Sequence, residues 1–150
     1  MDPVKADFSK LEKLLKELKS PYKTQIGVFS EATAPDGEKI ASYGADNEFG
    51  VITRRIPERS FIRMPLTTRQ DDIKKAVFRR AGKNLEDADI RQIFEDIGFA
   101  GEAIIQEAFD TRGFGAWPPN APETVFLKGS DAPLIDEGHL RHAITSKVVL

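Results

Sequence analysis

The stretch DADIRQIFEDIGFAGEAIIQEAF, Asp87 to Phe109, decides the fold of this chain. Apolar and small residues recur there every three or four positions and hold one face for about five turns, which predicts a long amphipathic helix. They are Ile90, Ile93, Phe94, Ile97, Gly101, Ile104, Ile105 and Ala108. Asn84 or Asp87 could cap its start. Gly98 and Gly101 each cost about 1 kcal/mol relative to alanine within a helix. We therefore expect a close neighbour there, most simply the sheet of the same subunit.

Strands are expected on both sides of this helix in the sequence. Residues 22 to 30 alternate in the manner of a strand, and residues 143 to 150 place Ile144 and Val148 on one face. We expect these two segments to pair. The predicted fold class is α+β, with a small mixed or antiparallel sheet packed against one long helix, an N-terminal helix and two extended loops.

Shorter helices are predicted from apolar spacing and from capping residues. They are Asp7 to Lys19, Glu38 to Phe49, Thr68 to Gly82, and a single turn from Glu137 to His142. Thr68 and Asp136 are the candidate N-caps, and Gly50 is placed to end the second helix. The residues Ala34-Pro35-Asp36-Gly37 predict a turn because proline presets φ and glycine accepts positive φ.

Two long segments show no sustained period. Val51 to Leu66 contains two prolines, and we expect an extended connection or a mobile arm. Phe114 to Ala132 is also rich in proline. A long stretch without regular structure in a compact domain is usually functional or disordered. Both segments are therefore expected as loops that become ordered when neighbours bury them.

Composition sets broad limits. A chain of 150 residues fits one domain with its own core, here taken to span residues 1–150. No apolar run approaches the roughly 20 residues that cross a bilayer, and the first residues lack a signal-peptide pattern. The absence of cysteine excludes disulfides, thiolate catalysis and cysteine-bound metal. We expect a protein of the cytoplasm that is not bound to a membrane.

Charge is divided along the sequence although the net charge is only -2. Residues 54–83 hold ten basic and three acidic side chains, whereas residues 84–110 hold eight acidic side chains and one arginine. The two blocks could neutralise each other within the fold. Alternatively, they could meet across neighbouring subunits in a head-to-tail contact that closes into a ring.

Candidate chemistry is sparse. His139 and His142 lie three residues apart and near Asp136, as helical metal ligands do, but no convincing fourth ligand follows. Asp131 or Asp136 could form an acid/base pair with either histidine, yet no activated nucleophile accompanies them. No glycine-rich phosphate loop is present. We predict no catalytic residue, no metal and no cofactor.

Clustered arginines make the segment from Arg54 to Arg63 a candidate for binding nucleic acid, since phosphate contacts need little beyond positive charge. Phe61 is a single ring there, which is not a stacking platform, and the acidic total opposes a polyanion. Trp117 is the only tryptophan. It could be an interface anchor, because tryptophan is enriched among interface hot spots, or it could fold back over the core as a plug.

Four segments occur in a set order: Asn47-Glu48-Phe49-Gly50, IPERSFIR at 56–63, WPPNAPETVFLKGSDAPL at 117–134, and PLIDEGHLRHAI at 133–144. This order resembles the tail-completion or head-to-tail joining family of long-tailed bacteriophages, also called minor tail or virion morphogenesis proteins. Ser60 stands where that pattern has proline, and His139 and His142 stand where it has other polar residues.

The resemblance implies a structural virion protein at the head–tail junction or upper tail, not an enzyme. Its expected partners are copies of itself in a ring, the head connector, and tail-tube or tail-terminator proteins, with DNA only nearby and no membrane. It would be located in the virion, and in the host cytoplasm during assembly. The interface candidates are Phe49, Arg54, Arg55, Arg59, Phe61, Arg63, Phe114 and Trp117. The alternative is a small nucleic-acid-binding accessory protein that uses the Arg54–Arg63 arm.

Overall fold

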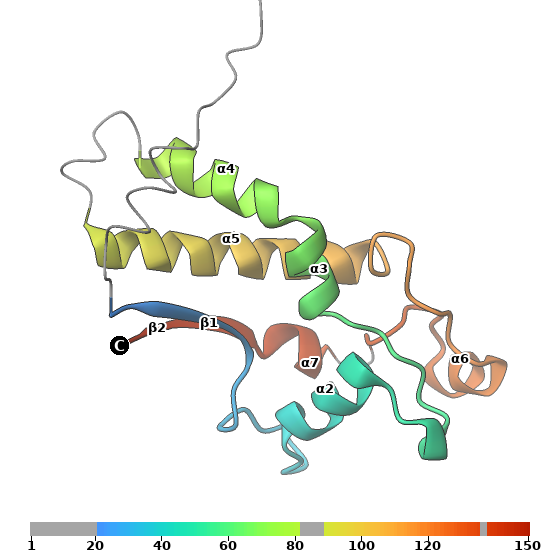
Figure 1. Cartoon of the computed structure of the whole chain (residues 1–150). Helices are drawn as coiled ribbons and strands as arrows, with labels where there is room; N and C mark the ends of the chain where they lie inside the picture. The colour runs from blue at the N-terminus through green and yellow to red at the C-terminus, as the bar shows by residue number, and fades with distance from the viewer. Residues whose placement is uncertain (1–20, 82–88, 136–137) are drawn as a thin grey trace, which may run out of the picture.

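A computed structural model describes residues 21–81, 89–135 and 138–150 of the chain (Figure 1). Its elements are β1 (Lys23–Val28), α2 (Ile40–Phe49), the 3-10 turn η1 (Ile52–Arg54), α3 (Arg63–Thr68), α4 (Gln70–Ala81), α5 (Ile90–Asp110), α6 (Pro122–Lys128), α7 (His139–His142) and β2 (Ile144–Val149). The small sheet and one long helix confirm the α+β class. The helix predicted at 7–19 lies outside the described residues.

The sheet and α5 form the main layer of the molecule. β1 and β2 pair antiparallel, from Lys23 opposite Val149 to Val28 opposite Ile144, which confirms the predicted pairing. α5 packs on both strands, and α4 packs on α5 (Figure 1). None of the helices in the described ranges is long and apolar enough to cross a bilayer.

Two glycines allow α5 to approach the sheet closely. A Cβ at Gly98 would lie 2.8 Å from the Cβ of Ser146, and one at Gly101 would overlap the tip of Ile26. The Thr24 hydroxyl also donates to the Phe94 carbonyl at 2.6 Å. The close neighbour inferred from the two glycines is therefore the sheet of the same chain, as predicted.

The start of α5 differs from the prediction. Its N-cap is Asp89, whose carboxylate accepts a hydrogen bond from the Arg91 N–H at 3.0 Å. The proposed caps Asn84 and Asp87 were wrong; both positions lie outside the described residues. Several acidic residues precede the helix in sequence, and composition alone does not tell which one takes the extended capping conformation.

The core lies beside the C-terminal half of α5. Ile105 and Ala108 are fully buried, and Phe109 is 2% exposed. The Phe109 ring lies 5.7 Å from the Phe61 ring and meets the Trp117 ring edge to face at 5.5 Å. Aromatic pairs at these distances are stabilising beyond the area that they bury. Segments distant in sequence thus share one core.

The segment from Val51 to Leu66 is not an extended arm. It contains η1 and the start of α3, and Phe61 and Pro65 are almost completely buried. The helix was missed because the segment contains two prolines and six helical residues are too few to show a period, although proline is tolerated in the first turn of a helix. Thr68 ends α3 instead of capping α4.

The proline-rich segment from Phe114 to Ala132 also contains regular structure. α6 begins at Pro122 and ends before Gly129, whose φ is 66° and whose N–H donates to the Val125 carbonyl at 2.9 Å. Proline at the first position and glycine after the last are known helix signals. The prediction of a loop was wrong because seven residues are too few to show an apolar period.

Three local predictions are confirmed. The Gly37 N–H donates to the Ala34 carbonyl at 2.9 Å in the predicted turn. α2 ends at Phe49 and is followed by Gly50 with a φ of 70°. α7 supplies the predicted single turn, although Asp136, its proposed cap, lies outside the described residues.

Candidate functional site

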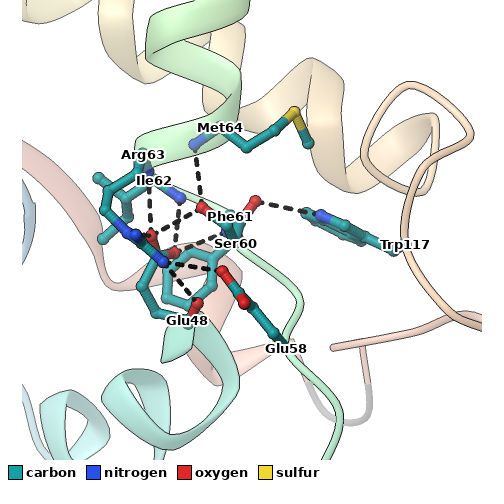
Figure 2. A network of polar contacts seen from close by, with 8 residues as sticks. All are labelled: Glu48, Glu58, Ser60, Phe61, Ile62, Arg63, Met64 and Trp117. Atoms are coloured by element: carbon teal, nitrogen blue, oxygen red, sulfur yellow. Dashed lines mark hydrogen bonds and ion pairs between the residues drawn. The ribbon is translucent and has the colours of Figure 1, made fainter. Parts of the chain in front are cut away.

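The segments Asn47–Gly50 and 56–63 meet at one buried carboxylate. Glu48 is 4% exposed, and its carboxylate accepts hydrogen bonds from side-chain and backbone donors of the second segment (Figure 2). The donors are the Ser60 hydroxyl (2.8 Å) and the backbone N–H groups of Phe61 (2.7 Å), Ile62 (2.9 Å) and Arg63 (3.1 Å). We call Glu48, the chain from Arg59 to Arg63, and Trp117 the Glu48 junction.

Glu48 acts as a remote cap for α3. The first N–H groups of a helix have no partner within the helix, and a carboxylate from α2 supplies one here. The Ser60 hydroxyl adds a second contact, because it accepts from the Met64 N–H at 2.9 Å while donating to Glu48. Ser60, which departs from the family's proline, therefore has a structural role of its own.

Arg63 contacts the Glu48 junction from its solvent-exposed side. Its Nε donates to Glu48 at 3.0 Å and its Nη2 donates to Glu58 at 2.9 Å. The guanidinium also lies over the Phe49 ring, 4.6 Å from the centroid. The hydrogen bond to Glu48 is the main reason why the pKa of Arg63 is raised. This arginine is about half exposed, but its charge is already compensated.

Arg59 and Trp117 connect the loop that begins at Trp117 to the chain from Arg59 to Arg63. The Arg59 side chain is buried and donates to the carbonyls of Pro118 and Pro119, both at 2.8 Å. Burial lowers the pKa of Arg59. The Trp117 indole N–H donates to the Ser60 carbonyl at 3.1 Å. Trp117 was considered either as an interface anchor or as a cover over the core, and the structure shows it packed over the core.

The interface candidates therefore divide into two groups. Arg59, Phe61 and Trp117 are internal and hold the protomer together. The second group is accessible: Phe49 is 62% exposed, and Arg54, Arg55 and Arg63 are exposed too. Phe114 is intermediate, because it is half-buried against the core and lies under the Arg69 guanidinium. Nothing in the sequence pattern distinguishes the two groups, because burial depends on contacts between distant segments.

Most arginines of the Arg54–Arg63 arm are engaged within the protomer. Arg54 pairs with Asp46 at 2.7 Å, Arg63 pairs with Glu48 and Glu58, and Arg59 is internal. Arg55 and Arg59 make no ion pair with the described part of the chain: Arg59 donates to backbone carbonyls, and Arg55 is exposed, with a left-handed φ of 54° at the end of η1.

The basic and acidic blocks of the sequence come together within one protomer. α4 packs against α5, and Arg69 bridges to Glu107 at 3.0 Å. Lys74 and Lys75 pair with aspartates in the first turn of α4. The intramolecular explanation of the charge division thus has direct support.

His139 of α7 lines a polar cavity of about 490 Å³ whose walls also include Arg59, Tyr43 and Lys128, whereas His142 does not line it. Burial, with smaller effects of Glu38 and Asp36, raises the pKa of Tyr43. No three His, Asp or Glu side chains within residues 21–81, 89–135 and 138–150 are placed to hold a metal ion.

Two apolar surfaces were missed in the sequence. One is a groove of about 240 Å³ between the end of β1, α2 and the start of α3. The other is α6, where Phe126 is 86% exposed and Leu127 is 83% exposed. The run Val125-Phe126-Leu127 was the available signal, but it lay in a segment that was taken for a loop.

Comparisons with known proteins add no identity: no family model matches, and neither a curated protein nor a solved structure shows significant similarity. The family resemblance therefore rests on the four sequence segments alone.

Proposed function

We propose that this chain is a structural subunit of a virion, placed at the head–tail junction or upper tail of a long-tailed phage or prophage, and that it acts through ring-forming contacts. The observation that carries the proposal is the Glu48 junction. Three of the four segments behind the family resemblance meet there through Glu48, Arg59 and Trp117. The occurrence of these three segments in one chain then has a structural reason, because each segment fixes the position of another.

The chemistry of the junction supports a scaffold and not a reaction centre. The Glu48 carboxylate is occupied by five donors, and the two carbonyl bonds of Arg59 hold a loop in place. A catalytic acid or base needs access to a reacting proton, and Glu48 is 4% exposed. These side chains fix segments that carry exposed apolar residues.

Those exposed residues support an assembly role. Ile52 on η1 is 96% exposed, and Phe126 and Leu127 on α6 are nearly as open. Both elements project on the right of Figure 1, away from the C-terminal end of β2. Contiguous exposed apolar surface often marks a site that a partner covers, and Phe126 and Leu127 are adjacent on α6. Under this proposal the partners are neighbouring copies, the head connector, and tail-tube or tail-terminator proteins, with DNA only nearby.

The nucleic-acid alternative has less support, since Arg55 is the one arginine of the arm that is exposed and not ion-paired within the described residues. Binding to phosphates needs accessible, uncompensated positive charge. In the arm, Arg54 and Arg63 are paired with carboxylates and Arg59 is internal. The assembly proposal is therefore preferred.

Inactivating the gene in the genome that carries it tests the proposal. Electron microscopy of the resulting lysates should show filled heads and separate tails, and the wild-type gene supplied in trans should restore joined particles. Joined, infectious particles formed without the protein would refute the assignment.

A further inference from the structure

The apolar groove on α2 has the character of a docking site. Its walls include Val28 of β1, Ala41 and Ala45 of α2, and Ile62 before α3, with Phe49 beside them. Ala45 and Phe49 are exposed. The groove is small enough that one or two apolar side chains would occupy it.

α6 presents such side chains on a fixed support. Phe126 and Leu127 are adjacent and almost fully exposed. The helix is held at its start by the bonds from Arg59 to Pro118 and Pro119, and Lys128 donates to the Ala132 carbonyl at 3.0 Å. A surface that is ordered before binding loses little conformational entropy when it docks.

The two surfaces lie on different sides of α2. Within its own chain, α6 borders the polar cavity that is lined by Tyr43 and Asn47. The groove is lined by Ala41 and Ala45. Side chains two positions apart on a helix point in nearly opposite directions, so α6 lies across α2 from the groove. A contact between the two surfaces therefore joins different patches of two copies.

Charge favours the same pairing. Arg55 lies on the turn that follows Phe49, whereas Arg63, which lines the groove, is already paired with Glu48 and Glu58. Glu123 lies one turn before Phe126 on α6 and is exposed. Neither Arg55 nor Glu123 forms an ion pair with any residue in the described ranges. An ion pair between Glu123 of one copy and Arg55 of the next would add to the apolar contact.

We propose that Phe126 and Leu127 of one copy enter the α2 groove of the next copy. The inference rests on the proposed function and specifies its subunit contact. Joining two different patches is a heterologous, head-to-tail contact, which closes into a ring when the rotation permits. One small groove gives a weak contact, so association grows with protein concentration.

Two variants of the full chain separate the two halves of the contact. Ala45→Phe fills the groove and leaves α6 intact. The double variant Phe126→Asp, Leu127→Asp removes the apolar pair and leaves the groove intact. Phe99→Asp is the matched control, because Phe99 is an exposed aromatic residue on α5, 59% exposed and outside both surfaces. Circular dichroism and Trp117 fluorescence check that each variant folds.

Sedimentation velocity over a range of concentrations measures the association. The wild type and Phe99→Asp should associate alike, and each of the other two variants should weaken the dissociation constant at least about tenfold. An equal mixture of the two defective variants should form a 1:1 pair that grows no further, because only one intact groove and one intact α6 can meet.

The contact is refuted if the wild type stays monomeric up to about millimolar concentration, far above the micromolar range of ordinary specific complexes. It is equally refuted if the two variants associate as the wild type does, or if their mixture forms no pair. If particles still fail to join without the protein, these results refute only the subunit contact and not the assembly role. Normal particles without the protein would instead remove the function itself.

Discussion

The α5–sheet layer and the Glu48 junction are held together by different means. In the layer, two strands and a helix satisfy their own backbone groups, and close packing at Gly98 and Gly101 joins them. In the junction, the chain before α3 is irregular, and the side chains of Glu48 and Trp117 bond directly to its N–H and carbonyl groups. Buried backbone groups need partners, so an irregular segment depends on a few polar residues where a regular one depends on many apolar residues.

The largest effect should follow removal of the central carboxylate. Glu48→Ala leaves the N–H groups of Phe61, Ile62 and Arg63 without their acceptor, whereas the Arg63 guanidinium keeps its bonds to Glu58 and to the carbonyl of residue 48. We expect a loss of about 3 kcal/mol or more in the free energy of unfolding, because each buried donor left without an acceptor costs about 1–3 kcal/mol. Chemical denaturation followed by circular dichroism measures it.

Glu58→Ala is the matched control for this substitution. Glu58 also pairs with Arg63, at 2.9 Å, but its side chain is 58% exposed. Exposed ion pairs contribute little, so Glu58→Ala should stay close to the wild type. Equal losses in the two variants would mean that the buried acceptor has no special importance.

The layer is tested by adding a methyl group. Gly98→Ala gains helix propensity of about 1 kcal/mol, but the new Cβ would meet the Cβ of Ser146. We expect a net loss of about 1–2 kcal/mol, because overpacking a core typically costs about 1–3 kcal/mol. Thermal unfolding measures it. Gly101→Ala should lose less, since its Cβ would meet the movable ends of the Ile26 and Leu66 side chains; the reverse order would contradict the packing described.

A milder test of the junction is Trp117→Phe. Phenylalanine keeps an aromatic ring over Phe109 but cannot donate to the Ser60 carbonyl. Leaving a buried acceptor without its donor costs about 1–3 kcal/mol, and we expect a loss at the lower end because the ring remains. Urea denaturation gives the value, and an unchanged stability would show that the indole N–H is dispensable.

The smallest expected effect is a loss of thermal stability at low pH. The hydrogen bond from Lys147 lowers the pKa of Glu31, and that from Arg69 lowers the pKa of Asp72. Because each folded pKa lies below the unfolded value, both pairs stabilise fully above about pH 5, and the gain is lost as the pH falls through the lowered values. The midpoint of thermal unfolding should decrease slightly in acid. Lys147→Met should reduce that decrease, and an unchanged decrease would count against the Glu31 pair.

The difference between the α5–sheet layer and the Glu48 junction explains which features of the fold could be predicted from the sequence. The spacing of apolar residues in α5 and the alternation in β1 and β2 reflect burial on one face, and the pattern is visible in the chain itself. Gly98 and Gly101 even indicated the close approach of the sheet. These are local signals that the fold keeps.

The junction could not be predicted in the same way. Nothing near Glu48 in sequence indicates that its carboxylate accepts from residues 60–63, and Arg59 looks like any exposed arginine until its partners at Pro118 and Pro119 are known. Such roles depend on contacts between distant segments. α3 and α6 were missed for another reason, since helices of six and seven residues are too short to show a period.

Locating the protein in purified particles tests the assembly role most directly. Antibody labelling seen by electron microscopy, combined with quantitative mass spectrometry, should find it at the junction of head and tail in a constant number of copies per particle. Purified, infectious particles that contain none of it would contradict the account.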